Sequence, residues 1–136
     1  MSRGLKNNNP GNIEQNNDNF QGEIKPSQDK RFKQFKSMPY GYRAMFVTLH
    51  TYLVKYNRDT IEKIITAWAP SVENHTENYI NCVVNWSGVP RDFKLTAKHG
   101  TSYIHIVAAM SRMENGVIAN MEDVIKGFEL QDKITR

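Results

Sequence analysis

The hydrophobic and polar positions divide the chain into a polar N-terminal part and a helical remainder. Residues 1–38 hold few aliphatic side chains, and their aromatic residues are separated by polar segments. This pattern predicts loops and a small β-hairpin with strands at 20–24 and 31–35. Over 39–136 the hydrophobic spacing changes to three and four residues, which predicts amphipathic helices.

The longest helical pattern covers 41–56. Its hydrophobic residues share one face, which predicts a central core helix with these inward positions: Tyr42, Met45, Phe46, Leu49, Leu53 and Tyr56. A capping box at 59–62 predicts the start of a short helix, which Pro70 ends. A second box at 74–77 predicts a helix that closes at Ser87-Gly88.

Two further helices complete the predicted set. Thr101 or Ser102 can cap the first, which ends at Asn115-Gly116 because Gly or Asn commonly takes the left-handed conformation there. The second has an apolar side made of Ile118, Met121, Ile125 and Phe128. With 136 residues and 39% hydrophobic content, the chain is long enough for one packed domain and too short for two. We therefore expect a single, mainly helical α+β domain over 1–136.

The charge balance is mildly basic, with 18 Lys and Arg against 14 Asp and Glu. Such an excess favours an anionic partner, such as a bacterial cell wall or nucleic acid. A solvated basic surface without any partner explains it equally well. Because no stripe of Lys and Arg is interleaved with aromatic residues, we expect no nucleic-acid partner.

Several classes of chemistry lack their sequence signatures. The single cysteine, Cys82, excludes an intramolecular disulfide and a Cys-based zinc site, and the four histidines show no metal-ligand spacing. We therefore expect no metal and no cofactor. The chain has no nucleophile-elbow motif, no phosphate-binding glycine loop and no dinucleotide fingerprint. It also shows no signal peptide and no apolar run of membrane-spanning length, which predicts synthesis in the bacterial cytoplasm.

Amide side chains gather in the segment 3–13, where Asn7, Asn8 and Asn9 run into Pro10-Gly11 and are followed by Asn12. Asn, Pro and Gly each favour turns, so the segment predicts one tightly shaped loop. Amides both donate and accept hydrogen bonds, and such a loop suits a ligand rich in hydroxyls and acetamides. A structured turn without a ligand is the competing interpretation.

Glu114 is the leading candidate for acid–base chemistry. It lies at the end of a predicted apolar helix, immediately before Asn115-Gly116. The negative end of the helix dipole and apolar neighbours both disfavour its ionised form, and a general acid must stay protonated near neutral pH. The competing interpretation is an ordinary surface glutamate in a last helical turn.

Two other carboxylates compete with Glu114. Glu73 precedes a predicted helix start, where the dipole favours the charged form, so it suits a charge stabiliser, a base or a structural anchor of its loop. Glu23, in the predicted hairpin, is a second carboxylate if it faces a cleft, and an exposed polar position otherwise. The aromatic residues Trp68, Tyr79 and Trp86 lie at core-facing spacing and are expected in the core first and against sugar rings second.

Several motifs together resemble a family of small phage and prophage proteins. They include Arg-Gly-Leu-Lys-Asn-Asn-Asn-Pro-Gly-Asn-Ile at 3–13, Trp-Ala-Pro-x-x-Glu-Asn-x-Thr at 68–76 and Met-Glu-Asn-Gly at 113–116. Members of that family are usually labelled virion structural proteins or lysozyme-like peptidoglycan hydrolases. The resemblance implies a lysozyme-like domain that cleaves peptidoglycan as a muramidase or lytic transglycosylase. Its implied place of action is the cell wall or a phage virion.

The chain otherwise resembles lysozymes and lytic transglycosylases, but the order of its motifs differs from theirs. In that superfamily the acid glutamate, in a Glu-Ser-Gly-like sequence, precedes the Asn-rich loop and the β region, whereas here Glu114 follows them. A circular permutation would reconcile the two orders by packing the helix 102–114 beside the N-terminal loop. The resemblance then implies that Glu114 is the acid. It also implies a set of residues that hold the glycan, namely Asn7, Asn8, Asn9, Asn12, Thr76 and Tyr79. A non-catalytic virion or envelope protein that binds cell-wall glycan is the alternative.

Overall fold

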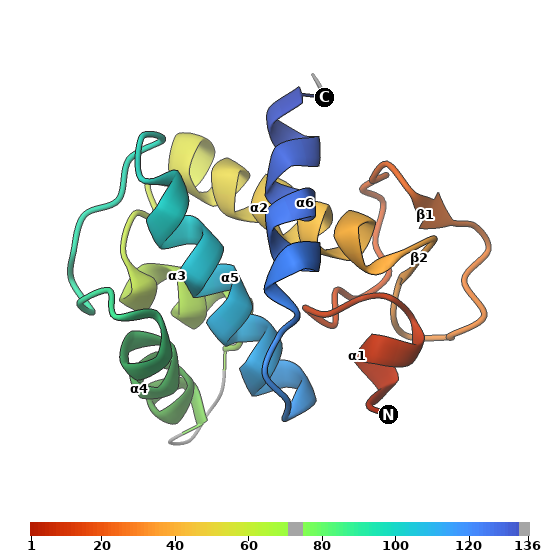
Figure 1. Cartoon of the computed structure of the whole chain (residues 1–136), viewed down its shortest axis with the longest axis horizontal. Helices are drawn as coiled ribbons and strands as arrows, with labels where there is room; N and C mark the ends of the chain where they lie inside the picture. The colour runs from red at the N-terminus through yellow and green to blue at the C-terminus, as the bar shows by residue number, and fades with distance from the viewer. Residues whose placement is uncertain (71–74, 134–136) are drawn as a thin grey trace.

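The computed structural model describes residues 1–70 and 75–133. Its elements are α1 (Arg3–Lys6), β1 (Glu23–Ile24), β2 (Gln34–Phe35), α2 (Met38–Tyr56), α3 (Ile61–Trp68), α4 (His75–Ser87), α5 (Gly100–Asn115) and α6 (Met121–Lys133). Figure 1 shows α6 crossing in front of α2, with α3 and α4 on one side and α1 and the hairpin on the other. The predicted mainly helical α+β architecture with a small N-terminal hairpin is confirmed.

The hairpin is shorter than predicted. Strands β1 and β2 pair antiparallel over two residues each, with Glu23 opposite Phe35. The rest of the second predicted strand pairs with the N-terminal loop instead, because Lys33 N–H donates to the Ile13 carbonyl and the Arg31 carbonyl accepts from the Gln15 N–H. The N-terminal loop therefore takes the backbone hydrogen bonds that a longer first strand would have made.

Helix α2 forms the centre of the core, as its hydrophobic spacing predicts. Tyr42, Met45 and Leu49 on its inward face are at most 1% exposed. Tyr56, expected to point inward, is 58% exposed, since it lies in the last turn beyond the packed part of the helix. The helix begins at Met38, earlier than predicted, because Pro39 is tolerated in a first helical turn.

The boundaries of the remaining helices agree with their capping signals at most ends. Thr60 caps α3 by accepting from the Lys63 N–H at 3.2 Å, and Gly116 closes α5 in the left-handed conformation at φ 74°. The predicted caps Thr101 and Ser102 are wrong, because α5 already begins at Gly100 and includes both residues. Asn74 of the second capping box lies outside the described residues.

The apolar face of α6 is only partly as predicted. Ile118 precedes the helix and is 74% exposed, and Ile125 is 43% exposed, whereas Val124 is fully buried. Gly127 sets this orientation: a Cβ there would lie 2.6 Å from the Tyr42 Cβ and 2.8 Å from the Pro39 carbonyl oxygen. The absence of a side chain lets α6 pack closely on α2, which makes these two the most extensively packed pair of helices.

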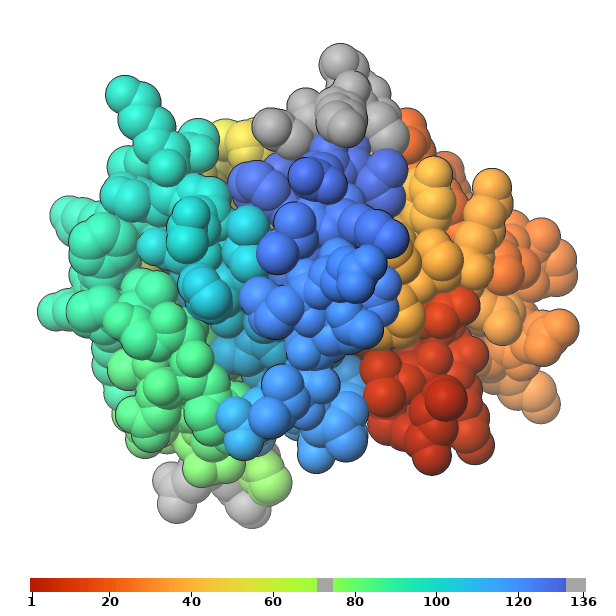
Figure 2. Space-filling model, viewed as in Figure 1, coloured from red at the N-terminus to blue at the C-terminus, as the bar shows by residue number. Residues whose placement is uncertain are grey.

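The N-terminal segment is bound to the C-terminal half of the chain. Helix α1 packs on α5, and Figure 2 shows the red N-terminal segment directly beside the blue helical part. The packing follows from Gly4, whose missing side chain leaves room for the Asn115 and Asn12 amide oxygens. Segments far apart in sequence thus meet at the end of α5.

Asp29 joins α1 to the hairpin region, and we expect Asp29→Asn to reduce the acid sensitivity of the fold. Its carboxylate accepts hydrogen bonds from the Arg3 guanidinium at 2.7 and 2.8 Å and from the Asn7 amide at 3.0 Å. The Arg3 bonds, with further bonds from the backbone and Asn7, hold the pKa of Asp29 well below its ordinary value.

A lowered folded-state pKa adds stability that is fully present above the ordinary carboxyl pKa and is lost progressively as the pH falls from that value toward the folded-state value. Between about pH 5 and pH 3, the melting temperature should therefore fall further for the wild type than for Asp29→Asn. Thermal unfolding followed by circular dichroism measures this, with the exposed Asp92→Asn as the matched control. Equal acid dependence of the wild type and Asp29→Asn would contradict the assignment.

Candidate functional site

The first three amides of the N-terminal motif hold the loop itself. Asn9 is fully buried, and its Nδ2 donates to the carbonyls of Ile13 at 3.0 Å and Lys33 at 2.9 Å, while its Oδ1 accepts from the Ile13 N–H at 2.9 Å. Asn8 adopts a left-handed φ of 52° and donates to the Phe35 carbonyl at 3.2 Å. Asn7 donates to Asp29. Because these bonds are internal, we leave Asn7, Asn8 and Asn9 out of the candidate site.

Asn12, the fourth amide, lies against Glu114. Its backbone is left-handed, at φ 50°, and its Nδ2 donates to Glu114 Oε1 at 2.9 Å. The Tyr79 hydroxyl of α4 donates to the other carboxylate oxygen, Oε2, at 3.0 Å. Burial, with the nearby Glu114 carboxylate, raises the pKa of Tyr79 well above its ordinary value, so the phenol remains a donor at neutral pH.

Glu114 is therefore held by neutral donors on both oxygens. It occupies the last turn of α5 and is half-buried. Within residues 1–70 and 75–133, no Lys or Arg forms an ion pair with it. A carboxylate that is oriented but not neutralised by a cation can still exchange a proton with a ligand.

Asn115 anchors the end of α5 to the N-terminal loop. Its Oδ1 accepts from the Ser2 hydroxyl at 2.7 Å, and its Nδ2 donates to the carbonyls of Pro10 and Ser111, both at 2.9 Å. A Cβ on Gly4 would lie 2.6 Å from the Asn115 Oδ1 and 2.7 Å from the Asn12 Oδ1. Because Gly4 has no side chain, α1 can approach Asn12 and Asn115, the two amide residues that adjoin the Glu114 carboxylate.

A surface cavity of about 660 Å³ opens beside Glu114. Its lining includes the Trp68-Ala69-Pro70 segment and residues of the loop from Gly11 to Asp18. Its aromatic lining comes from Phe20, Phe32, Tyr52 and Trp68. Trp68 packs on the core, as the sequence predicts, and also lines this cavity.

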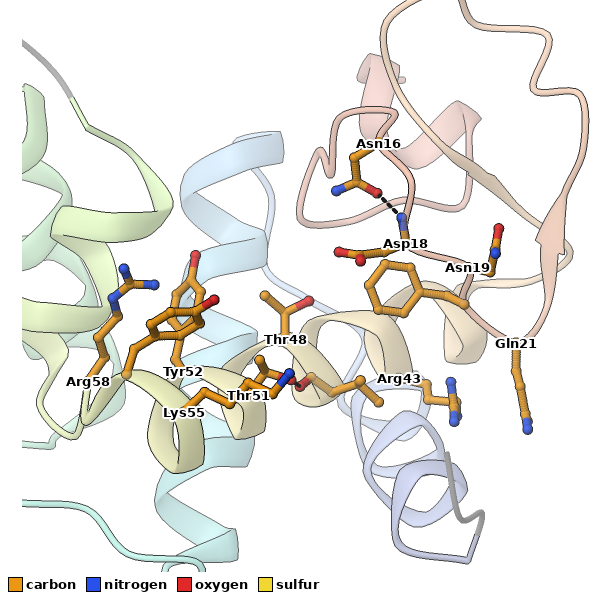
Figure 3. Close-up of a pocket in the computed structure, with 13 residues that line it drawn as sticks. Asn16, Asp18, Asn19, Gln21, Arg43, Thr48, Thr51, Tyr52, Lys55 and Arg58 are labelled. Carbon is orange, nitrogen blue, oxygen red and sulfur yellow. Dashed lines mark hydrogen bonds between the residues drawn. The ribbon is translucent and has the colours of Figure 1, made fainter.

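A second cavity of about 730 Å³ continues from the first along α2. The two cavities share the lining residues Asn16, Asp18, Phe20, Thr48 and Tyr52. In Figure 3 the polar loop with Asn16 and Asp18 lies across from Thr48, and Arg58 and Arg43 stand toward opposite ends of the pocket. Together the cavities form an extended groove, which we call the long groove, from Glu114 to Arg58.

The other predicted carboxylates do not join Glu114 among the described residues. Glu23 is bound to Lys33, whose Nζ lies 3.3 Å from both carboxylate oxygens, and neither cavity of the long groove is lined by it. A structural role for Glu23 follows, because Lys33 is itself only 1% exposed and needs this partner. Glu73 lies outside the described residues.

Two carboxylates that sequence reasoning missed line the cavity beside Glu114. They are Glu14, which pairs with Arg31 at 2.7 Å, and Asp18. The signal that could have identified them is their position directly after the Asn-rich motif, in a segment too polar to be core. Thr76, predicted to hold the glycan, donates its hydroxyl to the Ala69 carbonyl at 2.7 Å and so joins α4 to the segment beside the cavity.

The described part of the chain contains no cluster of three or more His, Cys, Asp and Glu side chains that could hold a metal ion. None of its helices has the length and apolar character that crossing a bilayer requires. The long groove presents carboxylates, amides, hydroxyls and aromatic faces, together with the cations Arg31, Arg43, Lys55 and Arg58.

The fold and the groove define a small, mainly helical protein whose N-terminal amide loop is built around the carboxylate that ends α5. No family model matches the chain. Protein P5 of Pseudoalteromonas phage PM2 is 46% identical over 132 residues, which cover 94% of this chain and 81% of that protein. The chain belongs to the family of this phage protein, and the relationship supports a phage origin.

Proposed function

We propose that this protein is a peptidoglycan-cleaving glycosidase of lysozyme-like type, with Glu114 as its acid and base. The observation that carries the proposal is the position of Glu114 on the wall of an open groove, oriented by Asn12 and Tyr79 without a cationic partner in the described part of the chain. The groove has the polar and aromatic lining that a glycan strand requires. We also propose that the fold is a circularly permuted lysozyme-like fold, which the packing of α1 on α5 supports.

The reaction begins with the protonated Glu114 giving its proton to the glycosidic oxygen as the bond to the sugar's C1 breaks. The resulting carboxylate then accepts a proton from the attacking hydroxyl. If water attacks, the product has a free reducing end, and if the sugar's own 6-hydroxyl attacks, an anhydro ring closes. Asn12 and Tyr79 hold the carboxylate in one orientation through both steps.

Asp18 and Glu14 are the groove carboxylates available to stabilise positive charge on the sugar ring or to activate water. Asp18 suits this role better, because Glu14 is already paired with Arg31. The Asp18 backbone is fixed on both sides of its peptide unit, with its N–H donating to Asn16 Oδ1 at 3.0 Å and its carbonyl accepting from Lys33 Nζ at 2.8 Å. These bonds position the loop that carries the carboxylate.

A second candidate function is a virion protein that binds cell-wall glycan without cleaving it. The relationship to a phage protein is compatible with this alternative, since it fits a structural component as well as an enzyme. The same groove would then hold the glycan, and Glu114 would accept hydrogen bonds from its hydroxyls. Both functions place the protein in a phage virion or at the bacterial cell wall.

The experiment that separates the two functions is incubation of the wild-type protein with purified peptidoglycan, followed by mass analysis of the soluble products. The glycosidase proposal predicts muropeptides of the disaccharide repeat, and an anhydro-muramyl mass identifies the transglycosylase reaction. Heat-denatured protein is the control. If the protein pellets with peptidoglycan and releases no fragments, the glycosidase proposal fails and the binding function stands.

A further inference from the structure

The second cavity of the long groove carries positive charge that the glycosidase chemistry does not use. Lys55 and Arg58, at the end of α2 and just beyond it, line the cavity that continues from Glu114. Figure 3 shows both on the α2 side of the pocket, with Tyr52 beside them. The groove therefore has a carboxylate in its first cavity and these two cations on the wall of the cavity that continues from it.

Arg58 is held in place by aromatic rings. Its guanidinium carbon lies 4.7 Å from the centre of the Tyr52 ring and 4.5 Å from that of Tyr56. Such cation–π contacts restrict the side chain and leave the edges of the guanidinium free to donate hydrogen bonds. A guanidinium prepared in this way suits a carboxylate or another planar anion.

Neither cation has an acidic partner among the described residues. Other basic side chains of the N-terminal half do have acidic partners: Arg3 pairs with Asp29, Arg31 with Glu14 and Lys33 with Glu23. Asp59, next in sequence to Arg58, pairs with Lys63 at 3.0 Å instead. The charge in the second cavity is thus available to a ligand.

We propose that Lys55 and Arg58 bind the carboxylates of the stem peptides that branch from a peptidoglycan strand. This inference rests on the proposed function, because it extends the same groove that would hold the glycan at Glu114. A polymer that places sugar rings beside Glu114 and a peptide carboxylate beside Lys55 and Arg58 complements the charge at both positions. The protein would then prefer strands whose peptides carry free carboxylates.

The test measures retention of the protein on insoluble peptidoglycan with native carboxylates and on the same material after its carboxylates are converted to neutral methylamides. All proteins carry Glu114→Gln, so that the peptidoglycan stays intact. We expect about fivefold stronger retention on the native material, as two partly exposed ion pairs would give. The double variant Lys55→Gln, Arg58→Gln should lose this difference.

A matched control removes the same charge elsewhere. Lys94→Gln, Lys98→Gln changes two exposed lysines outside the groove and should keep the fivefold difference, which excludes an effect of net charge alone. Arg58→Lys keeps the charge and should keep most of the difference. Equal retention of the Glu114→Gln protein on both materials, or an unchanged difference in the double variant, overturns the proposal. Because retention needs no cleavage, failure of the glycosidase proposal shows separately, as absence of fragments released by the wild-type protein.

Discussion

Glu114→Gln should reduce the release of soluble fragments from purified peptidoglycan by roughly 10²–10⁴-fold, the usual contribution of a general acid. The substitution keeps the shape of the side chain and removes its exchangeable acid proton. Asn12 can still donate to the remaining oxygen, and the Tyr79 hydroxyl can accept from the new amide, so both contacts of the carboxylate persist. The loss should therefore be chemical rather than structural.

The matched control is Glu129→Gln, which removes the same charge from an exposed position on α6. Both variants should unfold at the wild-type temperature, and only Glu114→Gln should lose activity. Fragment release by Glu114→Gln at the wild-type rate would remove Glu114 from the reaction. The acid would then have to be sought at Asp18 or at Glu73.

The meeting of Glu114 with the amide loop could be expected from the sequence, because the motif order pointed to it. What the sequence could not show is which amide makes the contact. Asn8 and Asn12 both have left-handed backbones, at φ 52° and 50°, yet Asn8 donates to the Phe35 carbonyl and Asn12 donates to Glu114. Local composition favours such conformations for Asn without fixing where each amide goes.

Tertiary packing overrode the sequence pattern at two further places. Lys33 lies in a segment predicted as a strand, yet its ammonium group is buried and bonded to Glu23 and the Asp18 carbonyl. In α6 the hydrophobic pattern alone favours Ile125 as inward, but close packing at Gly127 turns Val124 into the core instead. A glycine contributes nothing to a hydrophobic pattern, so its effect on helix orientation is visible only in three dimensions.

Glycine at 41 has a comparable role, and Gly41→Ala should destabilise the fold by about 3 kcal/mol, at the upper end of the usual cost of overpacking. A Cβ at this position in α2 would lie 2.1 Å from the Asn8 carbonyl oxygen and 2.6 Å from the Pro10 Cδ. Neither atom belongs to a flexible side chain, so the loop or the helix must move. Helix propensity alone predicts the opposite sign, since Ala is favoured over Gly inside a helix by about 1 kcal/mol.

Urea unfolding followed by circular dichroism measures the change in the free energy of unfolding. The control is Val54→Ala in the same helix, where the wild-type side chain is 61% exposed. The control should stay within about 0.5 kcal/mol of the wild type, as surface substitutions usually do. Gly41→Ala should also lower any glycosidase activity at temperatures where it remains folded, because displacement of Asn8 and Pro10 is transmitted to Asn12 and Asn115, which adjoin Glu114. A variant as stable as the wild type would show that the loop yields without cost, and the rigid placement of Glu114 by this loop would have to be abandoned.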